Sequence, residues 1–514
     1  MSNQTSDNNK RIAKNTTFLY IRMFIALIIN LYTSRLLLNA LGVEDYGIYN
    51  VVAGFVSLFG FLNATLSSSV QRFYNFEGVK NGSVGFRNVY MTSLLTHSII
   101  AVIILILLES VGLWYINKIM VLPSNRLFVA NILFQLSSFS MVLMTIQIPF
   151  VGAVMAKERM DFFAIVSIID VTLKLLIAIL VSWVTCDNLA LYGILLFGVS
   201  IIDLTLYIVF CKNKFKEMKF CRVFDKRIFL LMMSFSGWNL IGTFAFMLKG
   251  QGINMLLNVF FGPVVNAARG IAYQVNGAVS NFTSSVFVAF GPQVVKSYAE
   301  GNTLRTKKIM FTESKICFSL IAIILVPVAL EIDNLLHLWL GALVPEHTDI
   351  FSILVLLDSL ICTLNTPCTQ VAQATGRIKY YQISSSIVNL LLLPVAGVFL
   401  LLGFSAESAF VITIIISGVN QIICVYFANR LMRFGLLDYF SQIILRCFAL
   451  IVLLPILPLA IHILLPVGFF KVIIVSVSSL LSGIILIYEI VLCKEERLLL
   501  NDFIKVKIKK YAKG

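Results

Sequence analysis

Runs of about 20 apolar residues recur along the whole chain, and each is long enough to cross the ~30 Å hydrocarbon core of a membrane. The 514-residue chain is 59% hydrophobic and only 13% charged, whereas about a quarter of an ordinary soluble chain is charged. Nothing alternates over ~10 residues as the strands of a membrane barrel do. The sequence therefore predicts an all-α polytopic membrane protein with about fourteen transmembrane helices. The expected spans are 16–41, 46–70, 89–108, 127–150, 162–183, 189–210, 235–261, 266–290, 316–336, 350–371, 381–402, 409–428, 443–465 and 472–492.

The basic residues are distributed unevenly over the two sides of these spans. Most of the 40 Lys and Arg fall in the tails and in the loops on the amino-terminal side. The opposite loops contain only Lys118, Arg126 and Lys471. The positive-inside rule then places both termini in the cytoplasm. The net charge of +15 thus faces the anionic inner leaflet, and no nucleic-acid motif accompanies it.

The cysteines and histidines form no site. Nine cysteines are scattered without a close pair, and most lie in or beside apolar runs, so we expect small buried hydrophobic residues and no disulfides. The four histidines do not cluster. No cofactor and no metal site is predicted.

Two halves of the chain resemble each other. The tripeptide Leu-Leu-Asn at 37–39 recurs at 256–258, and a Pro/Ala/Arg pattern at 149–159 recurs at 367–377. Both pairs are separated by about 218 residues, and each half contains about six spans. An even number of spans per copy predicts parallel repeats, with a cavity at their interface.

The longest basic segment between spans separates the two copies and is expected to be a cytoplasmic loop. The predicted organisation is an N-terminal six-helix lobe (1–211), a basic loop (212–227), a C-terminal six-helix lobe (228–430), two extra spans (431–493) and a basic cytoplasmic tail (494–514).

Ionised residues inside the spans are the candidate functional groups, because each costs at least ~2.5–3.5 kcal/mol at a span centre. The first span contains two arginines and no acid, which favours a path for an anion. The candidate substrate-binding residues are Lys249, Arg22, Arg269, Arg35 and Lys174. The acids Asp170, Asp203 and Asp358 also lie within spans, and Arg446 is expected to anchor its span at the cytoplasmic surface.

Lys249 is the strongest of these candidates because it lies near the middle of its span, ~21 Å from the start at 1.5 Å per residue. Gly250 and Gly252 flank Gln251 beside it and are expected to allow a bend in the helix. Transporters place substrate at such breaks. The alternative is a lysine paired with a carboxylate for packing.

The other cations have explicit alternatives. Arg22 and Arg35 are near enough to the two ends of their span to extend to the interface, as is Arg269 at the end of its own span. Small residues surround Arg269 and would let a ligand or a helix approach. Lys174 follows Asp170 by four residues, the favourable spacing for a helical ion pair.

The chain resembles a known family. Two six-helix lobes with two extra spans, the Leu-Gly-Val-Glu-Asp-Tyr-Gly turn at 41–47 and the Ala-Thr-Gly-Arg-Ile-Lys-Tyr-Tyr segment at 374–381 are similar to those of the Wzx-type polysaccharide flippases. These belong to the multidrug/oligosaccharidyl-lipid/polysaccharide (MOP) exporter superfamily. The related lipid II flippase also has a cationic central cavity.

The resemblance implies a flippase in the bacterial inner membrane that moves an undecaprenyl-pyrophosphate-linked oligosaccharide to the outer leaflet for O-antigen or capsule synthesis. It implies the lipid-linked substrate, the bilayer and glycan polymerase or assembly proteins as partners, and a monomer. The alternative in the superfamily is a cation-coupled multidrug exporter of the MATE type, which typically has an acid on the first helix. A membrane glycosyltransferase would need a larger extramembrane loop, so we expect no enzyme.

Overall fold

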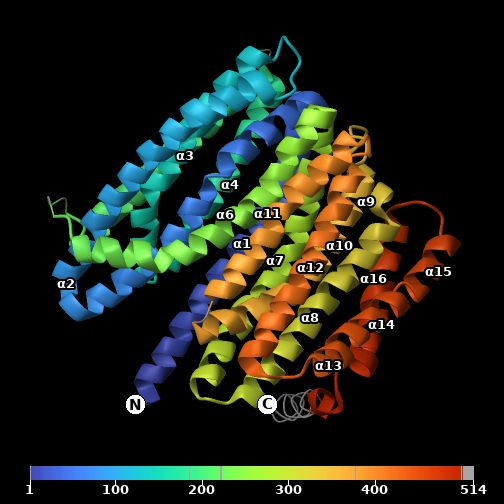
Figure 1. Cartoon of the computed structure of the whole chain (residues 1–514). Coiled ribbons are helices and arrows are strands. Elements are labelled where there is room, and N and C mark those ends of the chain that lie inside the picture. Colours follow the sequence, from blue (N-terminus) through green and yellow to red (C-terminus); the bar gives the residue numbers. More distant parts are fainter. Residues whose placement is uncertain are drawn as a thin grey trace. The chain divides into compact units, whose positions relative to one another are not determined.

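The computed structural model describes residues 2–184, 186–219, 221, 223–376, 378–498 and 501, with the side chains of 2–20, 64, 68, 235, 236, 238, 239, 285, 288 and 289 left out. Arg222, Arg377 and most of the predicted tail therefore lie outside the described residues. The described chain is helical throughout (Figure 1). Its first part contains α1 (Ser2–Ser57), α2 (Gly60–Leu107), two π-helical turns (Leu108–Gly112 and Tyr115–Ile119), α3 (Leu127–Ala156), α4 (Met160–Trp183), α5 (Asn188–Lys214), α6 (Lys226–Phe261) and α7 (Pro263–Ala299).

The second part of the chain continues the same pattern. It contains α8 (Thr303–Leu330), α9 (Ile332–Leu340), α10 (Thr348–Thr375), α11 (Lys379–Leu401), α12 (Glu407–Met432), α13 (Leu436–Tyr439), α14 (Leu445–Leu453), α15 (Ile456–Leu464) and α16 (Phe469–Leu486), with π-helical turns at Phe440–Ile444 and Ile487–Val491.

Twelve helices in the described part are long and apolar enough to cross a membrane, which confirms a multi-pass helical membrane protein. The sequence predicted about fourteen spans by length. One difference is at α1, which joins the first predicted span to the start of the second. The other is α7, which is absent from the twelve and has polar residues such as Asn266, Gln274 and Asn276 along its length.

Two glycines fix the turns that the sequence singled out. Gly42 interrupts α1 with φ 75° and ψ 170°, and Gly262 separates α6 from α7 with φ 74° and ψ −174°. Both follow a Leu-Leu-Asn tripeptide, so the two related sequences end in nearly the same backbone conformation. Glycine adopts this conformation without the steric cost that a side chain imposes.

A third glycine allows a close contact. A Cβ atom on Gly47 would lie 1.8 Å from the carbonyl oxygen of Pro263, so the second helical part of α1 can approach the start of α7 only because residue 47 lacks a side chain. This contact explains the last residue of the turn at 41–47.

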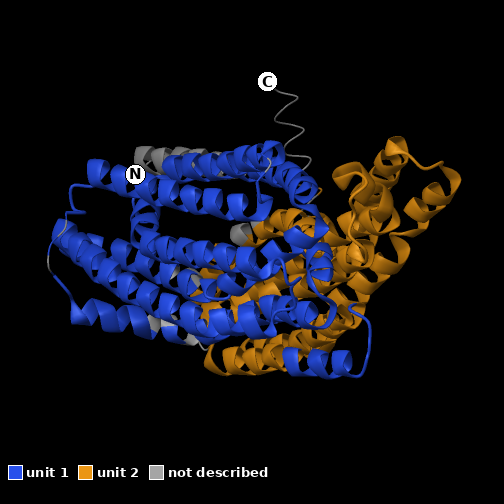
Figure 2. Cartoon of the chain, turned by 90° about the horizontal axis from the view of Figure 1, so that it is seen from above, with its two compact units in different colours: residues 1–270, 393–406 blue, residues 271–392, 407–514 orange. Residues whose placement is uncertain are grey.

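The chain forms two compact units (Figure 2), unit 1 being residues 1–270 with 393–406 and unit 2 being residues 271–392 with 407–514. In unit 1, α2 packs against α3 and α6, and α1 packs against α4. The units are defined by how compactly their residues pack, and their boundaries divide α7 and α11 between them. The predicted lobes were defined by a different criterion, the repeated sequence. The lobe boundaries at 211 and 228 stay a prediction.

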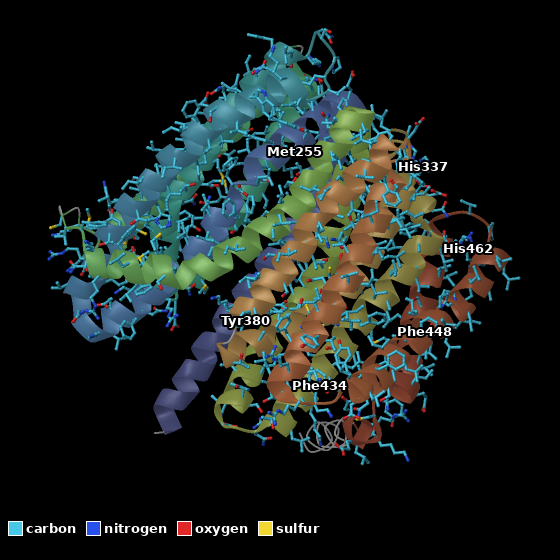
Figure 3. All side chains as sticks on the ribbon, in the orientation of Figure 1. Met255, His337, Tyr380, Phe434, Phe448 and His462 are labelled. Atoms are coloured by element: carbon cyan, nitrogen blue, oxygen red, sulfur yellow. The ribbon has the colours of Figure 1, made fainter. Side chains whose placement is uncertain are left out.

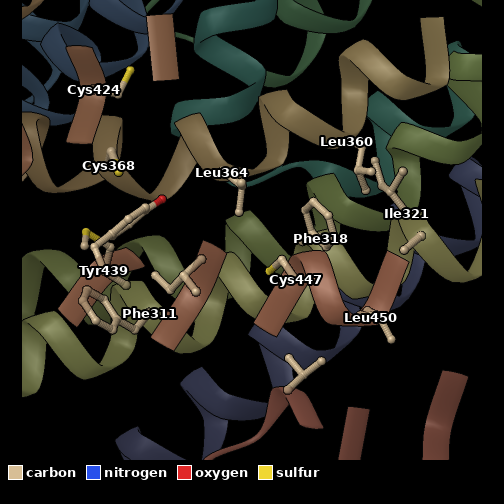
Figure 4. Packing of buried hydrophobic residues seen from close by; sticks show 14 of the residues in the cluster. Phe311, Phe318, Ile321, Leu360, Leu364, Cys368, Cys424, Tyr439, Cys447 and Leu450 are labelled. Atoms are coloured by element: carbon tan, nitrogen blue, oxygen red, sulfur yellow. The ribbon is translucent and has the colours of Figure 1, made fainter. Parts of the chain in front are cut away.

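Unit 2 has a core to which the last two candidate spans contribute. Side chains from α8, α10 and α12 pack with Tyr439, Cys447 and Leu450 (Figure 4). All nine cysteines are thiols, and Cys368, Cys424 and Cys447 are 1–2% exposed. The prediction of small buried cysteines without disulfides is thus confirmed for these residues.

Candidate functional site

Arg269 contacts α6 beside Lys249 in unit 1. Arg269, on the first turns of α7, is 5% exposed, and its guanidinium donates a hydrogen bond of 2.7 Å to the carbonyl oxygen of Gly250. Gly250 directly follows Lys249, which is half-buried. The positive charges of Lys249 and Arg269 are therefore held on adjoining helices at the level where the sequence placed the middle of a span.

Carboxamide side chains hold these helices together. Asn254 on α6 donates to the carbonyl oxygen of Asn50 on α1 at 3.0 Å. Asn266 on α7 donates to the carbonyl and side-chain oxygens of Asn254 at 2.6 and 2.9 Å. Asn258 bonds both the N–H and the carbonyl group of Val121, at 2.9 and 3.3 Å. We call Asn50, Asn254, Asn258 and Asn266 the carboxamide layer; it fixes the α6–α7 corner with neutral groups.

Glycines bring α1 into this layer. A Cβ atom on Gly270 would lie 2.5 Å from Asn50 Oδ1, and one on Gly54 would lie 2.5 Å from Asn254 Nδ2. The sequence predicted that the small residues around Arg269 admit a ligand or a helix. At Gly270 the neighbour in the structure is a helix, α1.

The bend expected beside Lys249 does not interrupt the helix: α6 is helical from Lys226 to Phe261, and Figure 1 shows it curved but unbroken. Gly252 instead allows close packing, since a Cβ atom there would lie 2.7 Å from the methyl groups of Leu393 on α11. The glycine pattern thus marks a helix–helix contact of unit 1.

The remaining candidates have other partners in unit 1. The Arg22 guanidinium lies 4.9 Å from the centre of the Phe163 ring, a cation–π contact. Lys174 Nζ is 2.8 Å from Asp170 Oδ1, which confirms the predicted i,i+4 ion pair. Asp203 on α5 is an electrostatic neighbour of both members of this pair. Arg35 is half-buried on α1.

A basic surface cavity lies beside a kink in α2, where Gly82 has φ 58°. The cavity measures about 730 Å³, and its lining residues are Gln71, Arg72, Asn75, Phe76, Val79 and Lys80. An adjoining cavity of about 350 Å³ is lined in part by Arg87, Lys216 and Lys219, so the basic loop predicted at 212–227 contributes cations to this face. The arrangement is suited to an anion with an apolar tail.

One acid at this face is paired. Glu217 accepts from Lys157 at 3.0 Å, and its pKa is lowered, mainly by a backbone hydrogen bond and further by Lys157. The carboxylate is therefore ionised at neutral pH, and the net charge of the face stays positive.

Sequence reasoning missed a set of buried charges in unit 2. Glu313 and Lys315 are 0% and 1% exposed, although the sequence placed them in a loop before a span starting at 316. The helix begins at Thr303, and the apolar residues Met310, Phe311 and Phe318 follow helical spacing across the assumed boundary. That periodicity was the available signal.

These charges attach the last two candidate spans to α8. Lys315 Nζ pairs with Glu496, which also accepts from Thr312. At the other end of α8, Glu331 is 1% exposed and lies 2.7 Å from His462 Nδ1 and 3.7 Å from Lys471 Nζ; His462 is labelled in Figure 3. We call these two groups the inner clamp (Lys315, Glu496) and the outer clamp (Glu331, His462, Lys471).

Comparison with known proteins places the fold. No family model and no curated protein sequence matches the chain. A structure of the lipid II flippase MurJ in an inward closed conformation matches with a TM-score of 0.68 at 13% identity, covering 92% of this chain and 98% of that one. An inward-facing multidrug resistance MATE family transporter of the MOP superfamily matches with a TM-score of 0.63 at 12% identity, covering 82% and 98%. The MATE multidrug transporter DinF-BH matches with a TM-score of 0.60 at 14% identity, covering 83% and 97%.

The chain therefore has the fold of these MATE family transporters and of MurJ. The match extends over most of the chain and agrees with the fold that the sequence resemblance implied.

Proposed function

We propose that the protein is a flippase that moves an undecaprenyl-pyrophosphate-linked oligosaccharide from the inner to the outer leaflet of a bacterial inner membrane. The observation that carries the proposal is the contact of Arg269 with the carbonyl oxygen of Gly250, the residue that follows Lys249. A pyrophosphate diester has about two negative charges, which cannot cross hydrocarbon unless fixed cations replace their water. Arg22, Arg35 and Lys174 are the further cations along this path.

Two energetic terms support outward movement of such a headgroup. A membrane potential that is negative inside favours outward transfer of an anion by ~2.3 kcal/mol per charge per 100 mV, or roughly 4–5 kcal/mol for two charges. The basic cavity at the α2 kink offers an initial site on the side of the 212–227 loop, the cytoplasmic side under the positive-inside rule.

The proposal includes a finer topology: about fourteen spans, in two six-helix lobes related as parallel repeats, two extra spans and cytoplasmic termini. The matching conformations of Gly42 and Gly262 after Leu-Leu-Asn support the repeat. Cysteine labelling tests the sidedness. A Lys216→Cys variant modified by an impermeant reagent from outside intact cells would overturn this topology.

The second candidate is a cation-coupled multidrug exporter, favoured by the matches to MATE transporters. Two observations favour the flippase. The first span contains no acid, and the MurJ match covers 92% of the chain against 82% for the first MATE match. The difference in coverage is about equal to the share of the chain that forms the last two candidate spans, Leu436–Leu464 and Phe469–Val491.

The test is surface glycan display by a strain whose own flippase is deleted. Lys249→Ala should abolish display at normal protein level, and Lys249→Arg should retain part of it, because the positive charge is kept. Lys118→Ala, which removes an exposed cation of the π-helical turn Tyr115–Ile119, is the matched control and should display glycan normally. Normal display by Lys249→Ala would overturn the proposed role of this lysine, whereas drug efflux without glycan display by the wild type would favour the exporter.

Under this proposal the protein works together with the enzymes that assemble O-antigen or capsule, and glycan polymerase is a partner. Glycosyltransferase genes beside its own would support this setting, and a drug-responsive regulator there would support the exporter.

A further inference from the structure

Glu313 is a carboxyl group enclosed inside unit 2. It lies on α8 and is 0% exposed, among apolar side chains such as Met310, Phe311 and Cys368 in the same core. An ionised carboxylate in such a place has a large desolvation cost unless a cation or several donors compensate it.

The polar neighbour of Glu313 is the carboxamide of Gln370 on α10, which interacts with the carboxyl group through its side chain. The NH2 group of Gln370 also donates to the carbonyl oxygen of Phe287 on α7 at 3.3 Å. Among the described residues neither oxygen of Glu313 has a hydrogen bond of normal geometry, and the buried oxygen of Gln370 also has none. The polar group beside this enclosed carboxyl is therefore a neutral amide and not a cation.

The charges nearest in sequence do not compensate Glu313. Lys315, two residues along α8, is paired with Glu496. Among the described residues, the thiols of Cys317 on α8 and Cys368 on α10 interact electrostatically with Glu313. Neither is a cation, so neither would stabilise a carboxylate here.

We propose that Glu313 is a proton-binding site, protonated in this conformation of unit 2 and donating its O–H to the oxygen of Gln370. One proton then satisfies the acceptors on both sides and ties α8 to α10, while the Gln370 NH2 group ties α10 to α7. Gly291 on α7 is close to the same carboxamide, since a Cβ atom there would be in ordinary van der Waals contact with Gln370 Oε1 at 3.8 Å.

The ligand of this site is a proton, and its release requires water. Separation of α8 from α10 would admit water to Glu313, the proton would pass to bulk solvent, and the carboxylate would remain hydrated. Closing the helices again requires a proton from solvent. If the chain transports as proposed above, proton binding at Glu313 couples the rearrangement of unit 2 to the pH of the compartment that it faces, and this part rests on the proposed function.

Infrared spectroscopy and thermal unfolding of the purified full chain test the site without any transport assay. The wild type should show the C=O stretch of a buried protonated carboxyl group, absent in Glu313→Gln and present in the control Glu300→Gln, whose side chain is exposed. Glu313→Gln should keep the wild-type Tm at neutral pH, because an amide N–H replaces the O–H. It should exceed the wild-type Tm at alkaline pH, where the enclosed wild-type acid loses its proton.

Two results would overturn the proton-binding site. One is a carboxyl band unchanged by Glu313→Gln; the other is a Tm for Glu313→Gln that falls at every pH, as expected if Glu313 were an ionised partner. Glu313→Ala, which removes the hydrogen bond and leaves a cavity, provides the reference for a destabilised core.

Coupling is measured in proteoliposomes with a fluorescent polyprenyl-pyrophosphate lipid and an imposed pH gradient. The gradient should stimulate flipping by the wild type and by Glu300→Gln, and should have no effect on Glu313→Gln. Equal stimulation of Glu313→Gln would overturn the coupling. A wild type that flips no lipid would instead contradict the proposed function, while the infrared result still decides the proton site.

Discussion

The α6–α7 corner of unit 1 and the attachment of α8 in unit 2 stabilise their buried polar groups in different ways. In unit 1, the α6–α7 corner is joined by amide side chains and main-chain groups, and the guanidinium of Arg269 rests on a carbonyl oxygen. In unit 2, α8 is joined to the last two candidate spans by ionised pairs, Lys315 with Glu496 and Glu331 with Lys471. Hydrogen bonds to uncharged groups connect the helices of the α6–α7 corner, whereas ion pairs connect α8 to the last two candidate spans.

Under the proposed function, this difference bears on where an anionic substrate would bind. The carbonyl oxygen of Gly250 is an uncharged acceptor that orients the Arg269 guanidinium. The cations of the two clamps are neutralised by carboxylates a few ångströms away, and an anion would have to displace those. The same difference determines how much a mutation destabilises each region. A buried charge left without its partner costs more free energy than a buried amide left without one.

The largest effect is expected from the inner clamp. Lys315→Met leaves Glu496 without its cation and should lower the free energy of unfolding by about 3–5 kcal/mol. The double variant Lys315→Met/Glu496→Met should recover most of this loss, because both charges are gone. Denaturant unfolding of the purified protein measures both. Lys308→Met removes the exposed pair with Glu495 and is the control, with little change expected; a double variant as unstable as the single one would contradict this account.

A smaller effect is expected from the carboxamide layer. Asn254→Ala removes the donor to the Asn50 carbonyl and one of the two acceptors of the Asn266 amide, and should cost about 1–3 kcal/mol. Asn131→Ala, which breaks an exposed amide pair with Asn117, is the matched control. If Asn254→Ala cost as much as Lys315→Met, the distinction between the two regions would fail.

The Asp170–Lys174 pair tests whether a charge pair in unit 1 behaves like the clamps of unit 2. Either single neutralisation should reduce the amount of inserted protein, and reversal of both charges should restore it together with transport. Quantitative immunoblotting and glycan display are the readouts. A double reversal that folds normally and transports nothing would assign Lys174 to the substrate path.

The smallest effect is the pH dependence of the inner clamp. Burial alone would raise the pKa of Glu496, but hydrogen bonds from Lys315 and Thr312 outweigh it and the pKa is lowered from 4.5. The pair therefore stabilises the fold above about pH 4.5, and this contribution is lost as the pH falls further through the folded-state pKa. Tm measured across this range should fall more steeply for the wild type than for Lys315→Met/Glu496→Met; parallel curves would contradict this.

The sequence predicted the helical class, the turn at Gly42, the buried cysteines and the Asp170–Lys174 pair, because each depends on local spacing or on composition. It placed Lys249 and Arg269 among the candidates but not at a common carbonyl, since that contact depends on how α7 folds back on α6. The sequence also predicted a break at Gly250 and Gly252. A glycine such as Gly252, whose missing side chain makes room for Leu393, cannot be distinguished in sequence from a glycine that bends a helix. Sequence reasoning missed Glu313 and Lys315 because charge alone was taken to end a span.

The clamps also impose an order on biosynthesis. Glu496 lies 181 residues after Lys315, and His462 lies 131 residues after Glu331, so α8 enters the membrane long before either partner has left the ribosome. During that interval Lys315 and Glu331 are charges in lipid without their counterions, a state that inserted helices tolerate poorly. A nascent chain stopped before residue 456 therefore contains every residue of the α6–α7 corner but lacks Glu496, His462 and Lys471, the partners of the buried charges of α8.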